Sequence, residues 1–425
     1  MLNLIRSHLK RNKALLKDNF SLFSMMLVAF IINYLFHFYI GKTLGPKDYG
    51  TFGVLLSIVY IIVMPLMAIQ TTLSKYVAEL NAKNEKSEIY YLLFKSLKKI
   101  GWFGLIISIL FLIISPLLAS FLKIDIISPL IILGSSIVFA FLVSVVRGFL
   151  QGLQKFKLLG LTFLLESLSK IFFGIPLVML GFGINGAIGG FALSFILPLF
   201  VLFYFIRKDF SNGESRKFNT SQIYRYSFPV LIMLVVLTGL YTLDVILVKR
   251  FFDPVIAGQY AALSLFGKII FFATLSISMV MFPKVLELSS EKKDSILLLY
   301  KSILIALFLG LSTSLLYFLM PEFIISMLFG EEFIVISPLL WIFGVIMTLF
   351  SICYLISFYN IALHRINFIY LIIFFNLLEV SLITLLHNSL EQVVTILIII
   401  MLLLLFTLTV YTIKNDKNIN YHSSV

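Results

Sequence analysis

The chain has 425 residues, of which 60% are hydrophobic and 12% are charged, and its formal net charge is +13. So little polar surface cannot coat a water-soluble globule, and the composition therefore indicates an integral membrane protein. The basic residues fall in short connections between apolar stretches, which makes anionic lipid headgroups, rather than nucleic acid, their expected neighbours.

Apolar stretches of about 20 residues recur along the whole sequence, each long enough to cross a hydrocarbon layer of roughly 30 Å as a helix. No alternation typical of membrane β-strands interrupts them. The basic first 19 residues lead into a span without a small-residue cleavage site, which indicates an uncleaved anchor. We therefore expect an all-α integral membrane protein with twelve spans, approximately at residues 20–40, 51–73, 101–122, 128–149, 159–180, 184–206, 226–248, 258–282, 297–320, 333–358, 366–386 and 391–413.

The Lys and Arg residues are distributed unevenly between the two sides of these spans. Of the 33, 26 lie in or beside the two termini and the connections on the same side, whereas 5 lie on the other side. Because short cytoplasmic loops are the ones enriched in Lys and Arg, we expect a multi-pass protein of the cell (cytoplasmic) membrane with both termini in the cytoplasm. The remaining two, Lys170 and Lys268, lie within spans.

A weak internal repeat divides the chain into two halves. An even number of spans separates the copies, so the repeat predicts a parallel duplication of six spans with a pseudo-twofold axis along the membrane normal. We expect an N-terminal six-helix lobe at 1–206, a cytoplasmic linker at 207–225 and a C-terminal six-helix lobe at 226–425. The matches, at offsets of 208 or 210, are Pro46 with Pro254, Gly50 with Gly258, and Leu153–Lys157 with Leu363–Asn367.

Four segments carry further motifs: Leu44–Gly50, Leu73–Glu79, Arg147–Gly152 and Gly181–Ala187. In this order they resemble the multidrug/oligosaccharidyl-lipid/polysaccharide exporter superfamily, in its polysaccharide-biosynthesis (O-antigen) flippase branch. The resemblance covers most of the chain and includes no catalytic signature. It implies a MATE-like fold of two lobes and the movement of a lipid-pyrophosphate-linked oligosaccharide to the outer leaflet. The chain lacks the two further spans of another branch, which argues against the lipid II type.

Ionisable residues inside spans are the candidate substrate-binding groups, because a charge at the bilayer centre costs about 2.5–3.5 kcal/mol on insertion scales and needs a partner or a water-filled cavity. Lys268 lies deep in the eighth span without an acid at i±3 or i±4, so it is the strongest candidate for binding an anion, with pairing to another helix as the alternative. Lys170 follows Glu166 by four residues, either as a neutralised local pair or as a cation released to bind phosphate. Arg147 either reaches the headgroups or offers its planar fork to a pyrophosphate.

Asp244 in the seventh span and Glu379 in the eleventh are the acids to consider. They either pair with Lys268 or Lys170, or couple transport to a proton or another cation. Asn33 and His37 lie four residues apart on the first span as polar groups of a cavity. A lone His in such a place is more often hydrogen-bonded between helices than a proton carrier.

Motifs for other chemistry are missing from the sequence. It contains no GxxxxGK[ST] loop, and its Cys and His residues lack metal-site spacing, so we expect no cofactor or metal, with Na+ or H+ coupling left open. We expect a flippase that works by alternating access, with the lipid-linked oligosaccharide, membrane lipids and polysaccharide assembly proteins as partners.

Two other functions remain open at this point. A cation-coupled multidrug antiporter would use the same fold, with acids as the dominant cavity groups. A membrane glycosyltransferase or polysaccharide polymerase would need a large ordered external loop, whereas the external connections here have only about 6 to 12 residues.

Overall fold

The computed structural model describes residues 2–200, 221–290 and 294–422. Within those ranges every regular element is a helix. The chain forms two compact units: unit 1 comprises Met1–Leu44 and Ile62–Leu231, and unit 2 comprises Gly45–Ile61 and Ile232–Val425. Most of the predicted linker at 207–225 lies outside the described residues, and the lobes at 1–206 and 226–425 stay a prediction.

Ten helical stretches among the described residues are long and apolar enough to cross a membrane. Two of them, Ser21–Ala82 and Phe156–Phe200, contain 62 and 45 residues. Since one crossing needs about 20 residues, each of these two has the length for two crossings. The expectation of an all-helical protein with about twelve spans is therefore confirmed.

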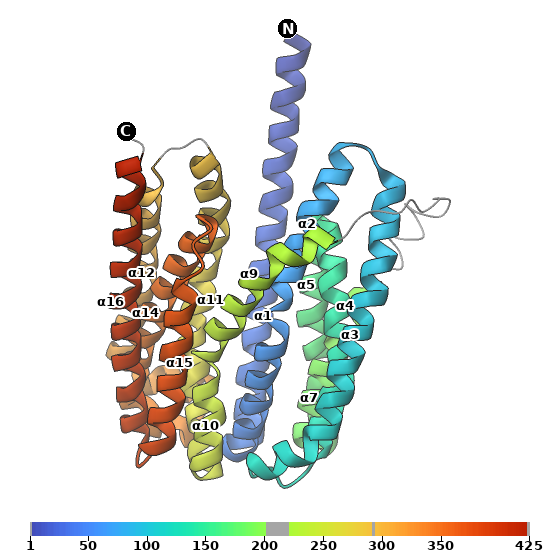
Figure 1. The fold of residues 1–425 in the computed structure, drawn as a ribbon. Coiled ribbons are helices and arrows are strands. Elements are labelled where there is room, and N and C mark those ends of the chain that lie inside the picture. Colours follow the sequence, from blue (N-terminus) through green and yellow to red (C-terminus); the bar gives the residue numbers. More distant parts are fainter. Residues whose placement is uncertain (1, 201–220, 291–293, 423–425) are drawn as a thin grey trace. The chain divides into compact units, whose positions relative to one another are not determined.

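Unit 1 contains the first part of α1 (Leu2–Val63) and the helices drawn in blue to green in Figure 1. Its helices pack closely through small residues. A methyl group on Gly152 of α4 would lie 2.6 Å from the carbonyl oxygen of Ser74 on α2. Its further elements are α2 (Leu66–Ala82), α3 (Lys86–Phe121), α4 (Ser128–Gly152), α5 (Phe156–Ser169), η1 (Lys170–Gly174), α6 (Ile175–Leu177), η2 (Val178–Phe182), α7 (Gly183–Ser194) and the first part of α9 (Ser221–Gly239).

The fifth span is not the uninterrupted α-helix that was expected at 159–180. It changes to a π-helix at η1, returns to one α-turn in α6, and becomes a π-helix again in η2. Pro176 contributes to the irregularity, because it has no N–H to donate within the helix. Gly174 also approaches Gly190 of α7 so closely that a methyl group on Gly190 would overlap its backbone. Such π-turns are frequent at functional sites.

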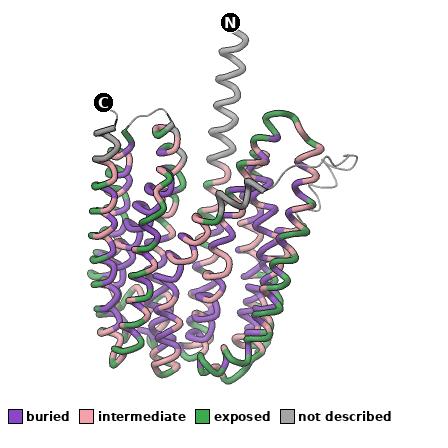
Figure 2. The backbone as a smooth tube through the Cα atoms, in the orientation of Figure 1, coloured by how far each residue is buried: buried purple, intermediate pink, exposed green. Residues whose placement is uncertain are grey.

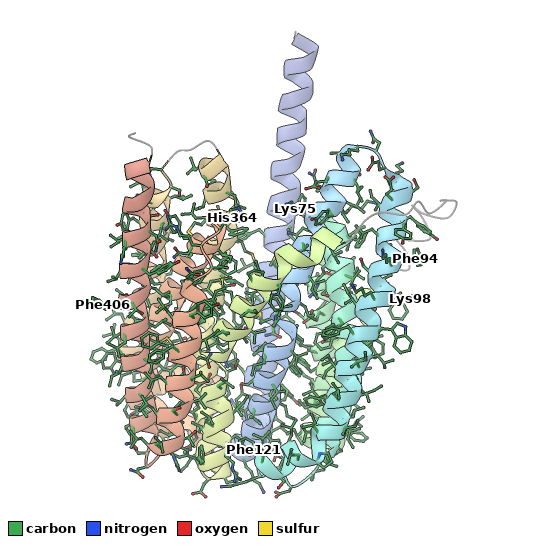
Figure 3. The ribbon with its side chains drawn as sticks, in the orientation of Figure 1. Lys75, Phe94, Lys98, Phe121, His364 and Phe406 are labelled. Atoms are coloured by element: carbon green, nitrogen blue, oxygen red, sulfur yellow. The ribbon has the colours of Figure 1, made fainter. Side chains whose placement is uncertain are left out.

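Unit 2 contains Gly45–Ile61 of α1 and the helices drawn in yellow to red in Figure 1. Along α16, exposed and buried residues alternate with the helical turn, so that one face of this helix is exposed (Figure 2). Phe406, labelled in Figure 3, is 67% exposed on that face, as expected for a side chain in contact with lipid. The elements that follow α9 are α10 (Leu243–Phe251), α11 (Pro254–Ser290), α12 (Ile296–Leu319), α13 (Pro321–Leu328), the 3-10 turn η3 (Glu331–Ile336), α14 (Ser337–Ala362), α15 (Phe368–Leu385) and α16 (Leu390–His422).

Two predicted boundaries are wrong. The connection at residues 41–50 is not a ten-residue break, because it is helical except at Gly45, where φ is 70° and ψ is 176°. One left-handed glycine suffices there, since Pro46 can start the next helical segment without an N–H donor. The seventh span, expected as one helix at 226–248, is interrupted by a turn at residues 240–242 between α9 and α10.

The predicted internal repeat is visible in backbone conformation. Gln154 and His364, 210 residues apart, both adopt the left-handed conformation, with φ of 56° and 57°. In each turn the next residue donates its N–H to the carbonyl five residues back: Lys155 to Leu150 at 2.8 Å, and Arg365 to Asn360 at 3.0 Å. The two turns therefore end α4 and α14 in the same way.

Candidate functional site

The first candidate site lies in unit 1 and joins three helices. Arg147 of α4 donates from Nη2 to Glu166 Oε2 at 2.7 Å. Lys170 Nζ lies 3.3 Å from Glu166 Oε1 and 2.8 Å from Asn33 Oδ1 on α1. Arg147 Nε also donates to Thr162 Oγ1 at 3.1 Å. The predicted local pair of Glu166 and Lys170 is thus present, and Arg147 is a second cation on the same carboxylate.

This cluster is largely shielded from solvent. The side chains of Arg147, Lys170 and Glu166 are only 12%, 7% and 18% exposed. Aromatic rings complete the surroundings of the cations: Arg147 lies 3.9 Å from the ring centroid of Phe163, and Lys170 lies 4.7 Å from that of Phe191. Two cations share one acid, so the three side chains carry a net charge of +1 when all are ionised.

The polar residues of the first span have different surroundings. Asn33 binds Lys170 and thereby links α1 to η1, which agrees with an interhelical role. His37 is 3% exposed, and its ring centroid lies 6.3 Å from those of Tyr34 and Phe36. His37 is therefore packed among aromatic rings of its own helix.

The second candidate site lies in unit 2, beside the turn that interrupts the seventh span. Asp244 stands in the first turn of α10, where a helix N-terminus favours a negative charge. Tyr260 of α11 donates its hydroxyl to Asp244 Oδ2 at 2.7 Å. The C-terminal end of α9 is hydrogen-bonded by Asn376, whose Nδ2 donates to the carbonyl of Val236 at 2.7 Å. The interruption thus places Asp244 at a helix N-terminus in the interior of unit 2.

Lys268 is 5% exposed and follows Tyr260 by two helical turns on α11. Its Nζ lies 5.7 Å from the ring centroids of both Tyr60 and Tyr241. It interacts electrostatically with Asp244, but among the described residues it has neither a hydrogen bond nor a close ion pair. Direct pairing of Lys268 with Asp244 or Glu379 is therefore absent from this conformation.

Several buried oxygen atoms of unit 2 lack a hydrogen-bond partner in the described part of the chain. Among them are both carboxylate oxygens of Glu379, Oδ1 of Asp244 and Oγ of Ser264. Glu379 is fully buried and interacts electrostatically with Asp244. Because an unpaired buried carboxylate is costly, these acids suit a bound proton or cation. The described residues contain no group of three His, Cys, Asp or Glu side chains that could hold a metal ion.

The sequence analysis did not identify four residues of the second candidate site, namely Tyr60, Tyr241, Tyr260 and Ser264. Tyr260, Ser264 and Lys268 are spaced at i, i+4 and i+8, so their common helix face could have been read from the sequence. Tyr60 and Tyr241 could not, because they reach Lys268 from other segments of the chain.

Comparisons with known proteins agree with this architecture. Residues 15–289, more than half of the chain, match the model of the family described as "Polysaccharide biosynthesis protein". A comparison with curated proteins gave no match.

Solved structures share the fold at low sequence identity. A multidrug resistance MATE family transporter of the MOP superfamily, in its inward-facing conformation, is 15% identical with a TM-score of 0.78, over 95% of this chain and 99% of that one. The eukaryotic MATE transporter AtDTX14 is 13% identical with a TM-score of 0.68, over 95% and 99%. A MOP superfamily transporter from Pyrococcus furiosus is 14% identical with a TM-score of 0.61, over 95% and 96%.

The predicted MATE-like fold is therefore confirmed, since solved MATE transporters share it over nearly the whole chain. The chain belongs to the polysaccharide biosynthesis protein family and is a multi-pass membrane protein with a MATE-like fold.

Proposed function

We propose that the protein is a flippase that moves a lipid-pyrophosphate-linked oligosaccharide from the cytoplasmic to the outer leaflet. The observation that carries this proposal is the cluster in unit 1, where Arg147 and Lys170 share the single carboxylate of Glu166. A surplus positive charge inside a membrane protein is costly unless an anion or a water-filled cavity compensates it. A diphosphate is the anion that this family's substrates would bring.

The geometry of the cations suits a diphosphate. The planar guanidinium of Arg147 can bind two phosphate oxygens at once, whereas the ammonium of Lys170 acts as a point charge. A diphosphate that replaces Glu166 as their partner would release that carboxylate, which is 18% exposed and so can turn towards water. Lys268 of unit 2 is a separate candidate for binding the anion, because its ammonium has no hydrogen bond among the described residues.

Alternating access of the lobes at 1–206 and 226–425 would carry the substrate across the membrane. The acids Asp244 and Glu379 would couple that movement to a proton or Na+, since three of their four carboxylate oxygens have no hydrogen-bond partner among the described residues. Both termini would be cytoplasmic, as the excess of Lys and Arg on that side indicates. In unit 1, Lys75 lies toward one end and Phe121 lies at the other (Figure 3).

A cation-coupled multidrug antiporter is the second candidate function. Glu379 favours it, since its buried carboxylate has no hydrogen bond within the described ranges and could exchange a cation for a cationic drug. In that case Lys268, Lys170 and Arg147 would serve only to balance the charges of the acids.

Deletion of the gene in its native host separates the two functions. A flippase predicts loss of the surface glycan, accumulation of the lipid-linked oligosaccharide in the cytoplasmic leaflet and unchanged susceptibility to cationic drugs. Normal surface glycan together with increased drug susceptibility would reject the flippase and support the antiporter. Expression of the gene from a plasmid should restore the glycan.

A further inference from the structure

One helical segment changes partner along the chain. Residues 45–61 belong to unit 2, although the residues before and after them, Met1–Leu44 and Ile62–Leu231, belong to unit 1. One backbone interruption lies at the start of this segment, and another follows shortly after its end. Gly45 breaks α1 with a φ of 70°, and a turn at Met64 and Pro65 separates α1 from α2. We call residues 46–63, between these interruptions, the rod.

The rod contacts its own repeat partner in α11. A methyl group on Gly258 would overlap the carbonyl oxygen of Pro46, and one on Gly50 would lie 2.8 Å from the backbone nitrogen of Gly258 and 3.2 Å from the carbonyl oxygen of Pro254. One turn further on, a methyl group on Gly53 would lie 2.7 Å from Cβ of Ala261, again at an offset of 208. The repeat-related residues therefore meet one another, which is the pattern of a self-complementary twofold contact.

This crossing depends on the absence of side chains. In a membrane, helices gain little from the hydrophobic effect on association, so close van der Waals packing of small residues holds them together. Such a contact can separate without leaving buried charges behind. Tyr49 adds a second anchor: it is 1% exposed, and its ring centroid lies 5.1 Å from that of Phe329 and 6.1 Å from that of Phe333.

The same rod reaches the buried cation of unit 2. Tyr60, near its far end, places its ring centroid 5.7 Å from Lys268 Nζ and 6.3 Å from that of Phe272. Departure of the rod would remove one of the two aromatic rings that lie next to this ammonium group. The position of the rod and the exposure of Lys268 are therefore linked.

We infer that the rod is a detachable gate, which docks on unit 2 through the crossing of Pro46 and Gly50 with Gly258, pivots at its two interruptions, and uncovers Lys268 when it leaves. The inference rests on the proposed function only in naming Lys268 as the substrate-binding cation that is uncovered. In a carrier built from two repeats, a contact between repeat-related residues has to separate when the passage opens on that side.

Cysteine crosslinking tests whether the rod has to leave. Cys353, the single native cysteine, is replaced by Ala, and the pair Gly53→Cys and Ala261→Cys is introduced. A disulfide needs a Cβ separation of about 3.5–4.5 Å, so the pair has to open by only about 1 Å from its present spacing. Oxidation should abolish glycan export and reduction should restore it, whereas the single-cysteine variants should be unaffected. Full export by the completely crosslinked protein would overturn the inference.

Labelling tests the docking contact without any substrate. Ser57 of the rod is 1% exposed, so a Ser57→Cys reporter should react slowly with a maleimide while the rod is docked. Adding Gly258→Ala should raise the labelling rate by about tenfold or more, because the new methyl group overlaps Pro46. The matched control is Gly189→Ala, where a methyl group would meet only Leu177 Cδ1, at 3.5 Å, and labelling should stay slow.

An unchanged labelling rate in the Gly258→Ala protein would overturn the docking contact. If that variant does not accumulate, the disulfide pair decides the question. Raised labelling in Gly258→Ala, together with normal surface glycan in cells that lack the gene, would uphold the gate and reject the proposed cargo.

Discussion

The cluster in unit 1 predicts that its acid and its cations differ strongly in their effect on stability. Glu166 bridges Arg147 at 2.7 Å and Lys170 at 3.3 Å, so the change Glu166→Gln leaves two cations side by side without a counter-ion. Removing one partner of a buried ion pair typically costs about 3–5 kcal/mol, and the 18% exposure of Glu166 places the expected loss near about 3 kcal/mol.

The change Lys170→Met should cost much less. Glu166 keeps its bond to Arg147, and the methionine fills most of the lysine's volume, so the loss is mainly one hydrogen bond to Asn33 and one to Glu166, about 1–2 kcal/mol together. The double variant should be more stable than Glu166→Gln alone, because it removes one of the two uncompensated cations.

Thermal unfolding of the four purified proteins in detergent measures this order. The midpoint should fall most for Glu166→Gln, least for Lys170→Met, and by an intermediate amount for the double variant. Lys98→Met, at an exposed position of α3, is the matched control and should leave the midpoint unchanged. Equal losses for Glu166→Gln and Lys170→Met, or strictly additive losses in the double variant, would refute the view that one carboxylate serves two cations.

Three further predictions rest on two buried positions of the structure and on the distribution of Lys and Arg along the sequence. Glu379→Gln should not lower the unfolding midpoint, because the carboxylate has no hydrogen bond to lose among the described residues. Glycan export by this variant should stop responding to the proton or Na+ gradient, and an unchanged response would exclude Glu379 from coupling. Gly190→Ala should destabilise the protein by about 1–3 kcal/mol and so lower its abundance in the membrane, since the methyl group overlaps the backbone of Gly174. Normal abundance on an immunoblot would contradict that packing. Fusions to a reporter enzyme active only outside the cytoplasm should be silent at Asn212 and active at Glu331; activity at Asn212 would overturn the topology.

The sequence predicted the class of fold because the apolar spans are long, and it predicted the repeat because Pro and Gly recur at a fixed offset. It also identified Glu166 and Lys170 as neighbours, since four residues separate them on one helix. Hydropathy indicates how deep a residue lies within a span, and the structure accordingly buries Lys268. It does not indicate which way a residue faces, so the third member of the unit 1 cluster, Arg147, could not be assigned from spacing.

The errors concern the backbone between spans. A Gly-Pro pair is typical of a loop. Here Gly45 alone adopts a positive φ, which redirects the helix, and the residues after it remain helical. The turn at residues 240–242 lies in an apolar stretch directly after Gly239, and the hydropathy that defined the span does not register a glycine as a helix end. Asn376 stabilises the end of α9 before this turn by donating to the carbonyl of Val236. The two residues are 140 positions apart, and only the fold brings them together.

The most direct measurement of the proposed function uses purified protein in lipid vesicles that contain a lipid-pyrophosphate-linked oligosaccharide. The fraction of this lipid in the outer leaflet is followed with a glycan-modifying enzyme added outside. The wild-type protein should move the lipid between leaflets, Lys268→Ala should not, and Lys268→Arg should retain part of the rate, because it keeps the charge but not the compact ammonium group. Movement no faster than in protein-free vesicles would contradict the proposed flippase. Equal rates for the wild type and Lys268→Ala would remove Lys268 from its mechanism.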